Sequence, residues 1–160
     1  MDYKYISKDT LNFISLHDCF IDNISFESNN LIWEMSHMFI LAEHQFNKSN
    51  KHKCTVGGFI IFEHFTVLDV YKNYGIPFDI ENQKAIGEVK KEPFQDIDKV
   101  ETLSVIFKDL EILQFELLYE KEDFKTYNFL ADNKKFFVEF TIQFRNIKIC
   151  WNDYIKENGL

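Results

Sequence analysis

Apolar and polar residues alternate along the stretch from Phe20 to Leu41, and this alternation constrains the fold more than any other feature of the sequence. Successive side chains of a β-strand point to opposite faces, so an alternating segment buries one face and exposes the other. Ser28 and Asn29 interrupt the alternation and suit a two-residue turn. Such a turn gives two pairs on one face: Phe26 with Leu31, and Ile24 with Trp33. The stretch therefore predicts an antiparallel β-hairpin.

A second hairpin is predicted around Asp132-Asn133, two residue types that tolerate the positive φ of a tight turn. The alternation of its second strand continues through residues 140–144 and resumes with shifted parity afterwards. That shift predicts a bulge or a turn near Arg145-Asn146. With a two-residue turn in the hairpin, the facing pairs are Ala131 with Lys134, Phe129 with Phe136, and Tyr127 with Val138.

The segment between the hairpins divides into strands and less regular stretches. Phe59–Val70 is apolar at nearly every position, which is the pattern of one central strand covered on both faces. The alternation in residues 113–119 adds a strand to a meander. Pro77–Glu92 suits either a short surface helix or an ordered loop, and Phe46–Lys53 predicts an exposed loop. Gly57-Gly58 predicts a bulge or the start of a strand.

These elements predict a mainly β fold, with an α+β fold as the alternative. We expect an antiparallel sandwich or a strongly curved sheet, built of hairpins and a meander, with one or two short helices. The chain has 160 residues, of which 46% are apolar, so it is long enough to bury a core of its own. We therefore expect residues 1–160 to form a single β-rich domain.

The chain carries a formal net charge of −8, and its only arginine, Arg145, stands beside seventeen lysines. The negative charge repels phosphate backbones, and bidentate readers of bases and phosphates are almost missing, so we expect no nucleic-acid partner. A basic protein partner fits this charge better. No run of about eighteen apolar residues occurs, so we expect no membrane span and no membrane partner.

The three cysteines, Cys19, Cys54 and Cys150, are widely spaced and form no CxxC pair. Their odd number and spacing favour neither a disulfide framework nor a zinc knuckle, and they indicate a reducing compartment. The amino terminus has no basic region followed by an apolar core, so we expect a cytoplasmic location. No basic cluster or helix start lies near these thiols in the sequence, so we expect them to be buried and unreactive.

The most specific local string is Leu16-His17-Asp18-Cys19, directly before the first predicted strand. His17 and Asp18 can supply a base and a carboxylate for binding or proton transfer, although neighbouring side chains converge only if they lie in a loop. The structural alternative is that Asp18 caps a turn and His17 bonds a backbone carbonyl. His44 and His52 flank a polar loop, and we expect both to be solvated.

A second candidate site combines Asp22, His37 and His64. Extending the register of the first hairpin sets Asp22 opposite Met35 and Phe20 opposite His37, which makes Asp22 and His37 diagonal neighbours. His64 falls on the apolar face of the predicted central strand. Two imidazoles and a carboxylate can bind zinc or iron, which would support a metal-assisted hydrolase. However, a buried histidine with one hydrogen-bond partner is far commoner than a metal ligand, so we expect no metal and no cofactor.

The same opening string carries a family resemblance. Residues 16–27, LHDCFIDNISFE, followed by Leu31, resemble the opening of small bacterial domains that begin with Leu-His-Asp and a small residue, some of which are immunity-type proteins of bacterial toxin systems. Frequent Lys, Ile, Asn and Phe with a single Arg are also typical of an AT-rich bacterial genome. The resemblance implies a bacterial protein that binds another protein.

These features leave three functions from different classes. The preferred one is a non-catalytic protein-binding module of the immunity type, which the net charge of −8 and two acidic clusters favour. A metal-assisted hydrolase is the first alternative. A β domain that binds a small apolar ligand is the second, because 17% aromatic residues suit either a dense core or a sheet-lined cavity. The acidic clusters are Glu116-Glu120-Glu122-Asp123 and Asp96-Asp98-Glu101.

Overall fold

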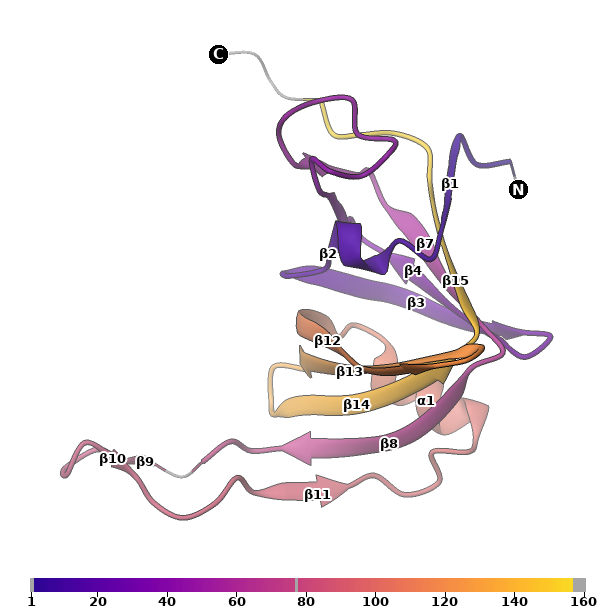
Figure 1. Cartoon of the computed structure of the whole chain (residues 1–160). Helices are drawn as coiled ribbons and strands as arrows, with labels where there is room; N and C mark the ends of the chain where they lie inside the picture. Colours follow the sequence, from indigo (N-terminus) through magenta and orange to yellow (C-terminus); the bar gives the residue numbers. More distant parts are fainter. Residues whose placement is uncertain (1, 77, 157–160) are drawn as a thin grey trace.

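The structure is a computed structural model that describes residues 2–76 and 78–156. Ten strands form one antiparallel sheet in the spatial order β1-β15-β7-β4-β3-β12-β13-β14-β8-β11, and this sheet does not close into a barrel (Figure 1). Strands hold 53% of the residues and helices 7%. The prediction of a mainly β fold with a strongly curved antiparallel sheet and a short helix is therefore confirmed.

Most of the chain lies in these elements. The main sheet contains β1 (Tyr5–Lys8), β3 (Cys19–Glu27), β4 (Asn30–Met35), β7 (Gly58–Glu63), β8 (Thr66–Asn73), β11 (Lys91–Pro93), β12 (Glu111–Lys121), β13 (Phe124–Asp132), β14 (Phe137–Phe144) and β15 (Asn146–Trp151). One small sheet contains β2 (Ile14–Ser15), β5 (Phe39–Ile40) and β6 (Lys53–Cys54), and another contains β9 (Phe78–Asp79) and β10 (Lys84–Ala85). The helical segments are the 3₁₀ turn η1 (Leu11–Phe13) and the helix α1 (Val100–Phe107).

The main sheet is bent into two halves that lie one above the other (Figure 1). β1, β15, β7, β4 and β3 form the upper half, and β12, β13, β14, β8 and β11 form the lower half. The chain crosses between the halves from β7 to β8 at His64-Phe65 and from β14 to β15 at Arg145. Among the described residues, strand pairing adds one short link, in which Phe20 faces Glu111 and Cys19 faces Ile112. The bend near Arg145-Asn146 was predicted and is confirmed.

Aromatic rings fill the space between the two halves. Trp33 of the upper half is fully buried, and its indole contacts Phe129 and Phe140 of the lower half at centroid distances of 5.3 and 5.9 Å. The helix α1 adds Phe107, whose ring lies 4.7 Å from that of Phe140. Because these rings pack against one another, the aromatic residues of the interior form a dense core.

The first predicted hairpin is confirmed in its turn and in the register next to that turn, whereas a β-bulge at Asp22 shifts the pairs predicted further along the strands. β3 and β4 pair Phe26 with Leu31 and Ile24 with Trp33. Ser28 and Asn29 both have positive φ, at 46° and 67°, as the two central residues of a type I′ turn require. The predicted strand at 113–119 lies within β12, and Gly57-Gly58 marks the start of β7, as expected.

The second predicted hairpin forms, but its turn is longer than expected. β13 and β14 pair Phe129 with Phe140, four residues beyond the predicted partner Phe136. The Asn133 side chain accepts N–H bonds from Lys135 and Phe136, which stabilises a wider turn. Because the shift is an even number of residues, every side chain keeps its predicted face.

Two segments differ from their predicted structure. The apolar run Phe59–Val70 is not one strand, because the chain turns at His64, where φ is +52°, and passes from β7 into β8. Both parts are rich in apolar residues because each half of the sheet faces the common core. Pro77–Glu92, predicted as a helix or a loop, belongs largely to an extended hairpin with the β9–β10 pair near its tip (Figure 1), and residue 77 itself lies outside the described residues. We call residues 74–90 the arm.

Candidate functional site

His17 and Asp18 lie in the turn between β2 and β3. The turn brings their side chains together, with Nδ1 of His17 3.0 Å from a carboxylate oxygen of Asp18. Both side chains are largely exposed. The carboxylate of Asp18 contacts the imidazole of His17, whereas the structural alternative had Asp18 capping the turn. A contact this exposed contributes little free energy, so the two side chains give no sign of a pre-organised catalytic dyad.

Asp22 and His37 do not become the diagonal neighbours that the sequence predicted. A β-bulge at Asp22 shifts the register, so that Ile21 and not Asp22 faces Met35. Asp22 is exposed. His37 Nδ1 lies 2.9 Å from the hydroxyl of Ser36, and its ring packs edge-on against a phenylalanine.

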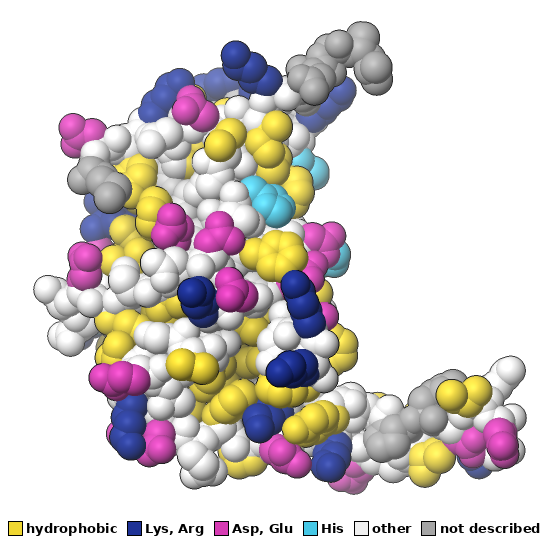
Figure 2. Space-filling model, turned by 180° about the vertical axis from the view of Figure 1, so that it is seen from behind, with side chains coloured by type: hydrophobic (Ala, Val, Ile, Leu, Met, Phe, Trp, Pro, Cys, Tyr) yellow, Lys and Arg dark blue, Asp and Glu magenta, His cyan; other side chains and the backbone are white. Residues whose placement is uncertain are grey.

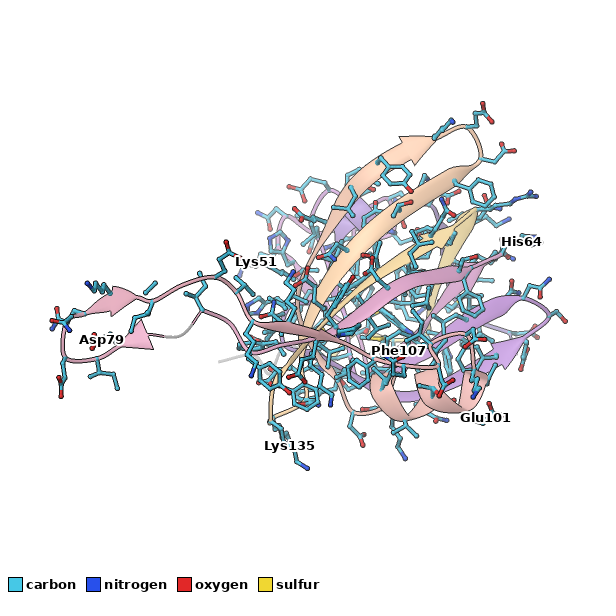
Figure 3. The ribbon with its side chains drawn as sticks, turned by 90° about the horizontal axis from the view of Figure 1, so that it is seen from below. Lys51, His64, Asp79, Glu101, Phe107 and Lys135 are labelled. Carbon is cyan, nitrogen blue, oxygen red and sulfur yellow. The ribbon has the colours of Figure 1, made fainter. Side chains whose placement is uncertain are left out.

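His64 lies apart from the other predicted site residues. It is exposed at the bend between β7 and β8 (Figure 3). The prediction that His64 lies on the apolar face of a central strand is therefore wrong, because the strand ends before this residue. Within the described parts of the chain, no three His, Cys, Asp or Glu side chains are placed to share a metal ion. The hypothesis of a metal site at Asp22, His37 and His64 is therefore not supported by their positions.

His44 is buried, which corrects the expectation that it is solvated. Only 1% of its surface is exposed, and its Nε2 lies 2.8 Å from the hydroxyl of the fully buried Ser7. Its Nδ1 accepts the backbone N–H of Phe46, so the neutral ring carries its proton on Nε2 and donates it to Ser7. A ring in this tautomer cannot take a proton from the serine. The contact is therefore structural and does not activate a nucleophile.

Burial of His44 has a consequence for stability against pH. Desolvation lowers the pKa of His44 below its ordinary value of 6.5. Below pH 6.5 the unfolded chain therefore binds a proton at this residue that the folded chain does not bind, until the pH reaches the lowered pKa. We expect the free energy of unfolding to be largest above pH 6.5 and to fall as the pH drops, as measured by urea titration from pH 7.5 to 5.0.

A His44→Gln variant isolates this contribution. Its free energy of unfolding should be lower than that of the native chain by roughly 1–3 kcal/mol at pH 7.5, because it disrupts a buried hydrogen bond. The difference between the two proteins should shrink at pH 5.0. If the difference in free energy of unfolding between the two proteins stayed constant across this range, His44 would have the same pKa in the folded and unfolded chains.

The three cysteines are unpaired thiols, as predicted. Cys19 and Cys150 are buried, as predicted, while Cys54 is partly exposed, which corrects the prediction for that residue. Burial raises the pKa of all three, that of Cys19 to about 12. The thiolate, which is the nucleophilic form, is therefore scarce at neutral pH.

The arm projects from β8 and β11 and stands clear of the rest of the molecule (Figure 1). The Asp79 carboxylate near its tip accepts N–H bonds from the backbone of Glu81 and Asn82 and from the Asn82 side chain. These bonds lower the pKa of Asp79, and the bond from the Asn82 side chain has the largest effect. They also hold the tip in a defined turn around Ile80. Among the described side chains of the arm, five large apolar ones are exposed: Tyr74 (45%), Ile76 (47%), Ile80 (82%), Ile86 (51%) and Val89 (42%).

The apolar surface continues from the arm onto the body. A hollow of about 290 Å³ lies where the arm meets the β13–β14 turn. Tyr74 and Phe136, whose rings are 6.0 Å apart, line it together with Phe137, which is 40% exposed. Figure 2 shows the molecule hollowed on this side, between the arm and the body. Sequence reasoning missed this surface, because isolated apolar residues in a polar segment carry no periodic signal.

A second feature is the outer end of the β12–β13 hairpin, on the opposite side of the body from the arm (Figures 1 and 3). Leu117, Leu118 and Tyr119 are consecutive here and 46–49% exposed. The first predicted acidic cluster surrounds them, with all of its side chains exposed. Exposed apolar and acidic side chains are thus combined at this end. We call residues 113–123 the acidic edge.

Comparison of the chain with protein-family models, curated proteins and solved structures finds no match. Among the residues that the structure describes, no helix is long and apolar enough to cross a membrane. Fold and surface together define a mainly β domain with a projecting arm and an acidic edge. The function must be inferred from the residues of these two features.

Proposed function

We propose that this chain is a protein-binding module that does no chemistry itself and that it holds its partner with the arm. The observation that carries the proposal is the exposure of Ile80, which is 82% exposed near the tip of the arm. Burying such a side chain in a partner is worth roughly 1.5–3 kcal/mol. An apolar side chain at a projecting tip therefore suits an anchor that enters a pocket of another protein.

The local structure of the arm supports this role. A two-stranded hairpin without a core of its own is only marginally stable in water. The bonds that Asp79 accepts from Glu81 and Asn82 define the tip before a partner arrives. A turn that is already ordered loses less conformational entropy on binding, which favours affinity.

Charge supports a basic partner. The net charge is −8, and the arm itself carries Asp79, Glu81 and Glu88 against Lys84 and Lys90. A chain of this charge attracts basic proteins over long distances and associates with them quickly at low salt. Together with the resemblance of residues 16–31 to immunity-type proteins, this favours a bacterial, cytoplasmic protein of the immunity type whose partner is a basic toxin.

The proposal is tested by placing a photo-crosslinking amino acid at position 80 in the encoding organism. Position 105 of α1 is the matched control, because Val105 is 81% exposed and Ile80 is 82% exposed. We expect one protein other than this chain to crosslink from position 80, and at least about tenfold less of it to crosslink from position 105.

Affinity measurements with that protein, once purified, complete the test. Ile80→Asp should weaken binding by about thirtyfold, since roughly 2 kcal/mol of apolar burial is lost. Val105→Asp should change the dissociation constant by less than about threefold. Equal crosslinking from both positions, crosslinking only to a second copy of the chain, or native affinity of Ile80→Asp would each contradict the proposal.

A further inference from the structure

We infer that the acidic edge is a second interaction surface, at which β12 binds an extended, lysine- or arginine-rich segment of a partner protein as an added β-strand. The inference does not depend on the arm, since the two features lie on opposite sides of the body (Figures 1 and 3). In the bound segment, basic residues alternate with apolar ones.

The first support is the open backbone edge of β12. β12 pairs with β13 along nearly its whole length, but it pairs with β3 only at Glu111 and Ile112. Beyond Ile112, the described residues provide no strand partner on this side. Figure 3 shows the hairpin standing out from the body at its upper right. Backbone N–H and C=O groups along such an edge are available to pair with another strand.

The second support is the apolar side chains beside this edge. A β-bulge lies at Leu118, between the pairs Leu117–Tyr127 and Tyr119–Thr126. Tyr127 and Thr126 are consecutive, so their side chains point to opposite faces of the sheet. Because a side chain lies on the same face as its cross-strand partner, Leu117 and Tyr119 also point to opposite faces. An added strand would therefore find an apolar contact on each face of the sheet.

The third support is charge, which decides between a foreign strand and a second copy of this chain. Residues 111–123 contain five acidic residues and one lysine. Two copies of this edge would place like charges opposite one another, which is unfavourable in a strand pair. A basic strand instead places lysine or arginine beside these carboxylates, and opposite charges across a strand pair are favourable.

The test uses a synthetic nine-residue peptide of alternating Lys and Val, blocked at both ends, and the ¹⁵N-labelled full chain. We expect the peptide to shift the amide resonances of residues 113–121. Two further peptides carry the same charge but are N-methylated on odd or on even residues, which removes the donors from one backbone edge. At least one of them should bind about tenfold more weakly, the equivalent of roughly 1.4 kcal/mol. A Glu–Val peptide should not bind.

Charge-reversal variants locate the site. Glu116→Lys with Glu120→Lys should weaken peptide binding at least about tenfold. The matched control is Asp98→Lys with Glu101→Lys in the second acidic cluster, which changes the net charge equally and should cost less than about threefold. Equal binding of all the Lys peptides, equal loss in both variants, or unchanged amide resonances at 113–121 would overturn the inference. None of these results bears on crosslinking from position 80.

Discussion

Replacing Trp33 with alanine is expected to lower the free energy of unfolding by about 3–5 kcal/mol, more than any other exchange considered for this chain. The side chain is fully buried and belongs to the upper half of the sheet. Its removal leaves a cavity where the two halves and the helix meet. The indole contacts four rings: Phe62 at 4.7 Å, Phe129 at 5.3 Å, Phe140 at 5.9 Å and Phe107 at 6.1 Å.

Equilibrium unfolding in urea, followed by circular dichroism, measures this loss. Trp33→Phe keeps an aromatic ring, and it removes an indole N–H that has no acceptor among the described residues. It should therefore cost only about 1–2 kcal/mol. The control is Leu68→Ala in β8, where the side chain is 43% exposed. It should lower the free energy of unfolding by less than about 1 kcal/mol. If Trp33→Ala cost no more than Leu68→Ala, the two halves would not depend on this residue.

Local patterns allowed the hairpins to be predicted. The turn of β3–β4 and the register next to it follow from residues within a few positions of Ser28-Asn29, so the sequence was sufficient for this part of the hairpin. The β13–β14 register was wrong by four residues because the Asn133 side chain widens the turn, and this bond is not visible in an alternation pattern. Its effect was small, since an even shift keeps each face.

Long-range pairing could not be predicted in this way. The bend at His64 interrupts a run that is apolar before and after the bend, because both halves of the sheet face one core. Within the run only the polar pair Glu63-His64 marks the bend, and such a pair also occurs inside continuous strands. The link between β3 and β12 joins residues about ninety positions apart in the chain. Sequence patterns report local periodicity and do not encode which distant strands become neighbours.

The candidate site was predicted less well, for related reasons. The pairing of Asp22 with His37 assumed an unbroken register, and one bulge removed it. His44 was expected in solvent because its neighbours are polar, but the fold brings it against Ser7, thirty-seven residues away. The apolar side chains of the arm are exposed because the arm stands clear of the core, and no local sequence pattern indicates this position. The sequence alone shows the acidic cluster at 116–123, but the open edge of its strand follows only from the strand order of the sheet.

Replacing Gly58 with valine is expected to lower the free energy of unfolding by about 3 kcal/mol, at the upper end of overpacking effects. Gly58 begins β7 and lies opposite Met35 of β4. A Cβ at this position would lie 2.8 Å from the backbone carbonyl oxygen of Cys150 and would also overlap the terminal methyl group of Met38. The methionine can move, but the carbonyl belongs to β15, so the two strands must separate.

Gly87→Val provides the comparison. Gly87 has a φ of +85°, which strains any residue with a side chain, but an added Cβ there meets no atom within 4 Å. Its strain is confined to the arm, so we expect a loss of about 1 kcal/mol or less in global stability. Gly58→Ala should fall between these two variants. If thermal unfolding gave Gly58→Val a melting temperature no lower than that of Gly87→Val, β7 and β15 could separate without a loss of stability. The close backbone approach at Gly58 would then contribute nothing to the stability of the upper half of the sheet.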